Sequence, residues 1–178
     1  MTFPDFNQNY FELFNLPEQF VLDGADLGKR FRQLQGQLHP DRFASKSPYE
    51  KRMAVQYSAE VNQAYAILRK PLDRALYLLE LAGMSREEVS SQKIDGGFLI
   101  EQMDLREKLE TIHDLVDPET VLEHLMIEIT GDIRAHEQEF RSAYESSELD
   151  NAAAACIKMQ YLEKLLQETE QIESGLLD

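Results

Sequence analysis

The chain has 178 residues, and 33 Asp and Glu against 18 Lys and Arg give it a formal net charge of −15. That excess argues against nucleic acid as a partner, because binding to phosphates requires clustered positive charge. The length suits one domain or two small ones, and no apolar run approaches the ~20 residues that a membrane-spanning helix needs.

The first predicted elements are a short aromatic-rich helix over residues 9–14 and a basic amphipathic helix over residues 27–38. Asp26 is the expected N-cap of the second helix. Its apolar residues recur at helical spacing and share one face, while three basic residues point away from that face. The apolar set is Leu27, Phe31, Leu34 and Leu38, and the basic set is Lys29, Arg30 and Arg32.

The basic helix runs into the tripeptide His39-Pro40-Asp41. Pro40 has no amide hydrogen and disfavours helical geometry at His39, so the helix ends here. The turn then displays His39 and Asp41 ahead of Arg42 and an exposed loop. Taken alone, the tripeptide also fits an ordinary helix-terminating turn, in which the His caps the last carbonyls and the Asp is a turn former.

Two further helices complete the N-terminal half. Pro48 starts a long helix that should end near Arg69, and the loop of about ten residues before it predicts antiparallel packing on the basic helix. Pro71 opens the next helix, which Gly83 stops near residue 82. This helix is apolar on more than one side, so we expect it to be covered on two faces.

The sequence of the C-terminal half predicts a polar linker followed by a bundle of three amphipathic helices. The helices are expected over residues 98–115, 118–144 and 150–172. Their expected N-caps are Asp95, Asp117 and Asp150. No strand alternation of any length is present, so the predicted fold is all-α.

Charge is divided unevenly between the two halves. Residues 1–82 contain ten basic and ten acidic residues, whereas residues 83–178 carry the whole net charge of −15. Such different balances predict two surfaces for two partners.

Motifs of catalysis are missing from the sequence. The single cysteine, Cys156, excludes an internal disulfide and a CxxC metal site, and its Ala-rich setting predicts a core residue. Glu110 and His113 have the Glu-x-x-His spacing of di-iron bundles, but the second such motif that these sites need is absent. Nucleophile-elbow and phosphate-loop motifs are also lacking. We therefore expect that the protein is not an enzyme and has neither a cofactor nor a metal site. The alternative is a di-metal helical-bundle enzyme.

Residues 98–110 carry more apolar surface than one helix of a three-helix bundle requires. Phe98, Leu105 and Leu109 can serve the core, while Leu99 and Met103 share another side. Either the helix is buried on two sides, or it exposes an apolar stripe flanked by acids as an interaction surface.

The order of these features resembles a known family. A basic helix, His-Pro-Asp and a second helix containing Asn-Gln-Ala-Tyr-Ala-Ile-Leu at 62–68 resemble a J-domain. Nearly the whole chain is similar to the HscB family, the J-type co-chaperones of iron–sulfur cluster assembly. The similarity rests on Tyr-Phe-Glu-Leu-Phe-Asn-Leu-Pro at 10–17, His-Pro-Asp-Arg-Phe-Ala-Ser at 39–45, Pro-Leu-Asp-Arg-Ala-Leu-Tyr-Leu-Leu at 71–79 and Phe-Leu-Ile-Glu-Gln-Met-Asp-Leu-Arg-Glu at 98–107.

The resemblance implies a J-domain over residues 1–82, a linker over 83–97 and a scaffold-binding domain over 98–178. The J-domain would stimulate the ATPase of a DnaK/HscA-type chaperone, and the bundle would bind an iron–sulfur cluster scaffold protein of the IscU type. A J-protein with another client is the alternative. The implied chaperone-binding residues are Lys29, Arg30, Arg32, His39, Pro40, Asp41 and Arg42, and the implied scaffold-binding residues are Leu99, Ile100, Met103, Asp104, Glu107 and Tyr161.

The N-terminal residues have neither a basic region nor an apolar core, and they lack the Arg-rich character of a transit peptide. We therefore expect no export signal and a cytoplasmic location. The net negative charge and the absence of long apolar runs lead us to expect neither nucleic acid nor membrane among the partners.

Overall fold

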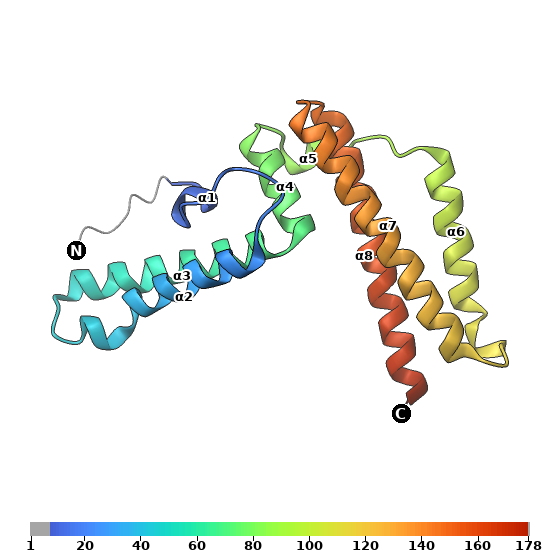
Figure 1. The fold of residues 1–178 in the computed structure, drawn as a ribbon, viewed down its shortest axis with the longest axis horizontal. Helices are drawn as coiled ribbons and strands as arrows, with labels where there is room; N and C mark the ends of the chain where they lie inside the picture. Colours follow the sequence, from blue (N-terminus) through green and yellow to red (C-terminus); the bar gives the residue numbers. More distant parts are fainter. Residues whose placement is uncertain (1–7, 178) are drawn as a thin grey trace. The chain divides into compact units, whose positions relative to one another are not determined.

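The computed structural model of the chain describes residues 8–177, apart from the side chains of residues 113, 176 and 177. Every regular element in the described residues is a helix (Figure 1). The chain forms two compact units, Met1–Leu78 and Leu79–Asp178, each with its own packing. In order, the α-helices of the described residues are α1 (Tyr10–Leu13), α2 (Gly24–Leu38), α3 (Pro48–Arg69), α4 (Pro71–Leu81), α5 (Arg86–Ser90), α6 (Gly96–Glu110), α7 (Pro118–Glu145) and α8 (Leu149–Leu177).

The first unit is built on an antiparallel hairpin of α2 and α3 (Figure 1). A short 3-10 helix, η1 (Pro40–Phe43), lies at its tip. Helix α3 has the predicted bounds because Ser47 and Glu50 form a capping box and Pro48 occupies the first turn. The face of α3 that packs inward consists of Ala54, Tyr57, Val61, Ala64 and Leu68.

Helix α2 begins three residues earlier than the sequence predicted. The Asp23 carboxylate accepts hydrogen bonds from the amides of Ala25 at 2.8 Å and Asp26 at 3.2 Å, so Asp23 is the N-cap. The assignment of Asp26 as N-cap was wrong. Asp26 lies in the first turn, where its carboxylate is available for a different contact described below.

The aromatic residues near the N-terminus are core residues, as predicted. Phe11 and Phe14 are almost fully buried. Tyr77 on α4 holds this segment in place, because its hydroxyl accepts a 3.0 Å hydrogen bond from the amide of Tyr10 and the two rings stack with centroids 4.5 Å apart. Helix α1 is therefore fixed against the remainder of the first unit.

The second unit contains the three-helix bundle of α6, α7 and α8, with α7 and α8 in extensive contact (Figure 1). Asp95 and Asp117 cap α6 and α7 as predicted, through hydrogen bonds from the amides of Phe98 and Thr120. The shared core consists of Phe98, Leu105, Leu109, Ile112, Leu122, Leu125, Ile129, Leu162 and Leu165.

Several boundaries in this unit differ from the sequence prediction. Residues 83–97 include helix α5, which packs on α8 and contains the buried Val89. Helix α6 ends at Glu110 rather than near residue 115, because Thr111 leaves helical geometry and a 3-10 turn, η2 (Ile112–Asp114), follows.

The start and end of α8 also differ from the prediction. The Glu148 carbonyl already accepts the amide hydrogen of Ala152, so α8 begins at Leu149, and Asp150 lies in its first turn instead of capping it. The helix continues to Leu177 rather than ending near residue 172. Within residues 8–177, none of the helices combines the length and the apolar character that crossing a membrane would require.

Candidate functional site

The His-Pro-Asp turn stands at the exposed end of the hairpin. His39 is the C-cap of α2 in an extended conformation, with φ −57° and ψ 134°, and Pro40 then opens η1. The Nδ1 atom of His39 lies 3.4 Å from the amide nitrogen of Asp41 and 3.4 Å from its Oδ2. Both side chains are exposed, so the turn offers an imidazole and a carboxylate to a partner.

Two buried residues hold the turn in place. Leu38 precedes it and Phe43 follows it, and both side chains are buried in the hairpin. Because the apolar anchors lie on either side of the three exposed residues, the backbone of the turn is fixed at both ends. A turn that is already ordered loses little conformational entropy when it binds a partner.

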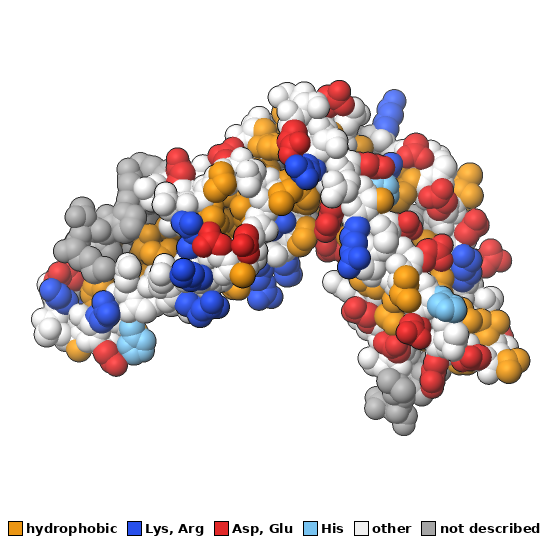
Figure 2. All heavy atoms as spheres, in the orientation of Figure 1, with side chains coloured by type: hydrophobic (Ala, Val, Ile, Leu, Met, Phe, Trp, Pro, Cys, Tyr) orange, Lys and Arg blue, Asp and Glu red, His pale blue; other side chains and the backbone are white. Residues whose placement is uncertain are grey.

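Basic side chains accompany the turn along the hairpin. Lys29 and Arg32 on α2 and Arg42 in η1 are exposed, as the sequence predicted. Figure 2 shows Lys and Arg side chains gathered over the hairpin of α2 and α3, whereas many Asp and Glu side chains lie over the α6–α8 bundle. The exposed cations are suited to attracting an acidic partner surface.

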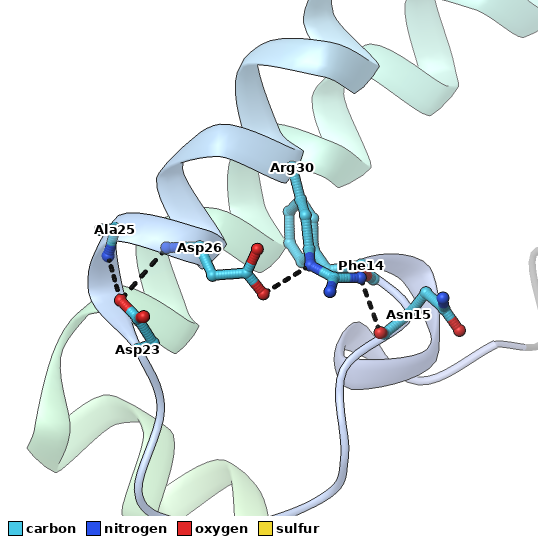
Figure 3. Close-up of polar contacts among 6 residues, drawn as sticks. All are labelled: Phe14, Asn15, Asp23, Ala25, Asp26 and Arg30. Carbon is cyan, nitrogen blue, oxygen red and sulfur yellow. Dashed lines mark hydrogen bonds and ion pairs between the residues drawn. The ribbon is translucent and has the colours of Figure 1, made fainter.

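Arg30 is placed differently from its basic neighbours. Its Nε donates to Oδ2 of Asp26 at 2.8 Å, and its Nη1 donates to the carbonyl oxygens of Phe14 at 3.1 Å and Asn15 at 2.8 Å (Figure 3). The guanidinium is therefore engaged inside the first unit. Helical periodicity places Arg30 with the exposed cations, but it cannot reveal carbonyl acceptors that lie fifteen and sixteen residues earlier.

An apolar hollow of about 440 Å³ lies next to the turn, between η1 and α3. This hollow was not predicted from the sequence. A signal in the sequence was Val55, an exposed apolar residue off the buried face of α3. The apolar lining of the hollow includes Leu38, Pro40, Phe43, Ala54, Val55 and Ala59.

The second candidate surface is the outer side of α6. The exposed fractions of Leu99, Ile100 and Met103 are 42%, 62% and 70%. On the opposite side, Phe98 and Leu105 are buried in the bundle core. Within the part of the chain that the structure describes, α6 thus has one buried side and one exposed apolar side, which favours an interaction surface over a doubly buried helix.

The remaining predicted residues adjoin this stripe. Asp104 and Glu107 are exposed on α6 and supply negative charge. Tyr161 on α8 is 44% exposed, and its ring packs edge-on against Phe98 with centroids 6.3 Å apart. This contact connects Tyr161 on α8 to the first turn of α6, from which Leu99 and Ile100 project. We call Leu99, Ile100, Met103, Asp104, Glu107 and Tyr161 the α6 surface.

The residues considered for catalysis show no arrangement typical of a reactive centre. Cys156 is buried and unpaired, and burial raises the pKa of its thiol to about 12, so it is a core residue as predicted. Among the described side chains, no group of three or more His, Cys, Asp or Glu is placed to hold a metal ion. The side chain of His113 lies outside the described residues.

The exposed turn and the exposed stripe can be compared with known proteins. A co-chaperone protein HscB homolog from Shewanella loihica is 42% identical over 171 residues, which cover 94% of this chain and 99% of that protein. The chain belongs to the HscB family of co-chaperones. Residues 94–170 match the family described as the HSCB C-terminal oligomerisation domain.

Solved structures of the HscB family confirm the fold. The chaperone HscB from Vibrio cholerae is 41% identical and superposes with a TM-score of 0.85, covering 95% of this chain and 99% of that one. The human co-chaperone protein HscB is 31% identical and also gives a TM-score of 0.85, over 96% of this chain and 84% of that one. The predicted family and the all-α fold, an N-terminal J-domain and a C-terminal three-helix bundle, are confirmed.

Proposed function

We propose that the chain is a co-chaperone with two protein-binding surfaces and no active site of its own. Its J-domain stimulates ATP hydrolysis by a DnaK/HscA-type chaperone, and its bundle delivers an iron–sulfur cluster scaffold protein of the IscU type to that chaperone. The single observation that carries this proposal is the exposed apolar side of α6 in a member of a co-chaperone family. Leu99, Ile100 and Met103 all have large exposed fractions, so they contribute less to the bundle core than the buried residues on the other side of the helix.

The J-domain acts on the chaperone through charge and through the fixed turn. Lys29, Arg32 and Arg42 attract an acidic surface of the chaperone, and salt weakens this attraction. His39 and Asp41 then contact the chaperone and favour its hydrolysis-competent conformation. The effect is a population shift by differential binding, and the catalytic groups belong to the chaperone.

The α6 surface binds the scaffold protein. Leu99, Ile100 and Met103 form its apolar centre, and Tyr161 extends it onto α8. Asp104 and Glu107 at its edge favour a partner that carries basic side chains around an apolar patch. Apolar contact supplies most of the affinity, and the acids select the partner and its orientation.

Covalent linkage of the two surfaces is the basis of delivery. We assign residues 1–82 to the J-domain, 83–97 to a connecting segment and 98–178 to the scaffold-binding domain. A scaffold protein bound to one end of the chain experiences a raised effective concentration at the chaperone. We place this activity in the cytoplasm. A J-protein with a different client would share the first step and differ in the partner of the bundle.

Calorimetric titration of the full chain with each purified partner, alone and then in sequence, tests the proposal. We expect the scaffold protein and the chaperone to bind together in one ternary complex, because their surfaces lie on different parts of the chain. Competition between the two partners would contradict separate surfaces. Chaperone binding without scaffold binding would favour a J-protein with another client.

A further inference from the structure

Lys158 on α8 is an unusually sheltered lysine. Its side chain is 18% exposed, and its Nζ lies 3.2 Å from Oδ2 of Asp95 and 3.8 Å from Oε2 of Glu139. The same ammonium stands over the ring of Phe98, 5.7 Å from the centroid. A lysine charge is rarely buried to this extent unless it is paired, so these contacts compensate for the water that the ammonium has lost.

Asp95 connects Lys158 to the start of α6. One carboxylate oxygen, Oδ1, accepts the amide hydrogen of Phe98 at 2.8 Å and so caps the helix, while Oδ2 faces the Lys158 ammonium. The cap hydrogen bond and the ammonium together lower the pKa of the Asp95 carboxyl. The first turn of α6 is therefore tied to α8 through one carboxylate.

Phe98 is the apolar centre of the same cluster. Its ring is buried and packs edge-on against His136 on α7 at 5.6 Å and against Tyr161 on α8 at 6.3 Å. Nδ1 of His136 lies 2.8 Å from Oε2 of Glu139, the same oxygen that faces Lys158. The three bundle helices converge on this ring.

The cluster supports the part of α6 that is weakest as a helix. Residues 96 and 97, the first two residues of α6, are both glycine, which is a poor helix former. The first turn of α6 therefore depends on tertiary contacts. Leu99 and Ile100 follow Phe98 directly, and Tyr161 stands one turn after Lys158 on α8, so the cluster adjoins the α6 surface from both helices.

From these contacts we infer that Lys158 is a positioning residue for scaffold binding. It holds Asp95 and the ring of Phe98 on α8, and thereby sets the placement of Leu99, Ile100 and Tyr161 relative to one another. The inference rests on the proposed function of the α6 surface. Lys158 itself need not touch the scaffold protein, because its charge is already paired within the bundle.

Two substitutions at Lys158 and one control test the inference in the full chain. Lys158→Met keeps the length of the side chain and removes its charge, Lys158→Arg keeps the charge, and Lys93→Met removes an exposed charge just before α6. We expect Lys158→Met to weaken binding of a purified IscU-type scaffold protein about fivefold, with Lys158→Arg and Lys93→Met near the wild-type affinity.

Amide hydrogen exchange of the chain without any partner supplies the second readout. Lys158→Met should accelerate exchange over residues 96–103 and leave the core amides of α7 and α8 unchanged. In the background of Leu99→Ala and Met103→Ala, Lys158→Met should cause little further loss of affinity, because it acts through the surface that those changes remove.

Each contrary result has a distinct meaning. Faster exchange throughout the bundle would show that Lys158 merely stabilises the fold and would overturn the inference. The inference would also be overturned if Lys158→Met bound the scaffold protein with the same affinity as the wild-type chain. Failure of the wild-type chain to bind the scaffold protein would overturn the proposed function itself.

Discussion

The guanidinium of Arg30 donates a hydrogen bond of 2.8 Å to the carbonyl oxygen of Asn15, fifteen residues earlier in the chain. Asn15 follows the short helix α1 in left-handed geometry, with φ 52°. Carbonyl groups at the end of a helix lack partners within it, so Arg30 caps α1 from α2. Asp26 holds the guanidinium in position one turn before it on α2. Arg30, which was predicted to bind the chaperone, thus joins α1 and α2 within the first unit.

Replacement of Arg30 should therefore affect stability. We expect Arg30→Met to lower the free energy of unfolding by about 1 to 2 kcal/mol, because charge-assisted hydrogen bonds to two carbonyls and a carboxylate are lost. Lys29→Met and Arg32→Met, on the exposed side of the same helix, should change it by less than about 0.5 kcal/mol. Urea unfolding of the three variants, followed by circular dichroism, measures the difference.

The same variants divide the basic residues by function. Lys29→Met and Arg32→Met should reduce chaperone stimulation most at low salt, since the attraction between exposed charges is screened as salt rises. If Arg30→Met kept full stability but lost stimulation, Arg30 would belong to the chaperone-binding surface after all.

The exposed side of α6 should separate binding from folding. Leu99→Ala combined with Met103→Ala should weaken scaffold binding about tenfold or more and change stability little, because both side chains are exposed. Leu105→Ala, on the buried side of the same helix, should instead cost about 2 to 5 kcal/mol of stability. Thermal unfolding together with calorimetric titration compares them. A large fall in the melting temperature of the Leu99/Met103 variant would assign these residues to the core.

The cap of α6 gives a pH dependence of known sign. The amide of Phe98 and the ammonium of Lys158 lower the pKa of the Asp95 carboxyl below its ordinary value of 3.8. Its contribution to stability is fully present above pH 3.8 and is lost as the pH falls through the lowered value. Asp95→Asn should therefore destabilise the bundle most at neutral pH, and its melting temperature should approach that of the wild type in acid. A difference in melting temperature between Asp95→Asn and the wild type that stayed constant as the pH fell would contradict a stabilising role for the Asp95 charge.

Local signals were sufficient for much of the fold. The start of α3 at Pro48 and the Asp caps of α6 and α7 could be recognised, because a capping carboxylate and the amide that donates to it lie within a few residues of each other. The N-cap of α2 was predicted wrongly as Asp26 instead of Asp23, since both carboxylates stand near the start of the helix. The contacts of Arg30 with the carbonyl groups of Phe14 and Asn15, and that of Lys158 with Asp95, could not be predicted, because only tertiary packing brings these residues together.

The two candidate surfaces also differ in how far they could be predicted from the sequence. Periodicity separated the buried Leu105 from the exposed Leu99 on α6, because a single helix determines which residues share a side. The hollow beside the His-Pro-Asp turn was missed, since it is formed jointly by η1 and α3.

Steady-state ATP hydrolysis by a DnaK/HscA-type chaperone is the first measurement to make on the proposed co-chaperone activity. The rate would be measured with the chaperone alone, with this chain added, and with this chain plus an IscU-type scaffold protein. We expect the chain to stimulate hydrolysis and the scaffold protein to increase the rate further. His39→Gln should abolish the stimulation without a change in melting temperature, because His39 is exposed. An unchanged rate on addition of the wild-type chain, or full stimulation by His39→Gln, would contradict the proposed function.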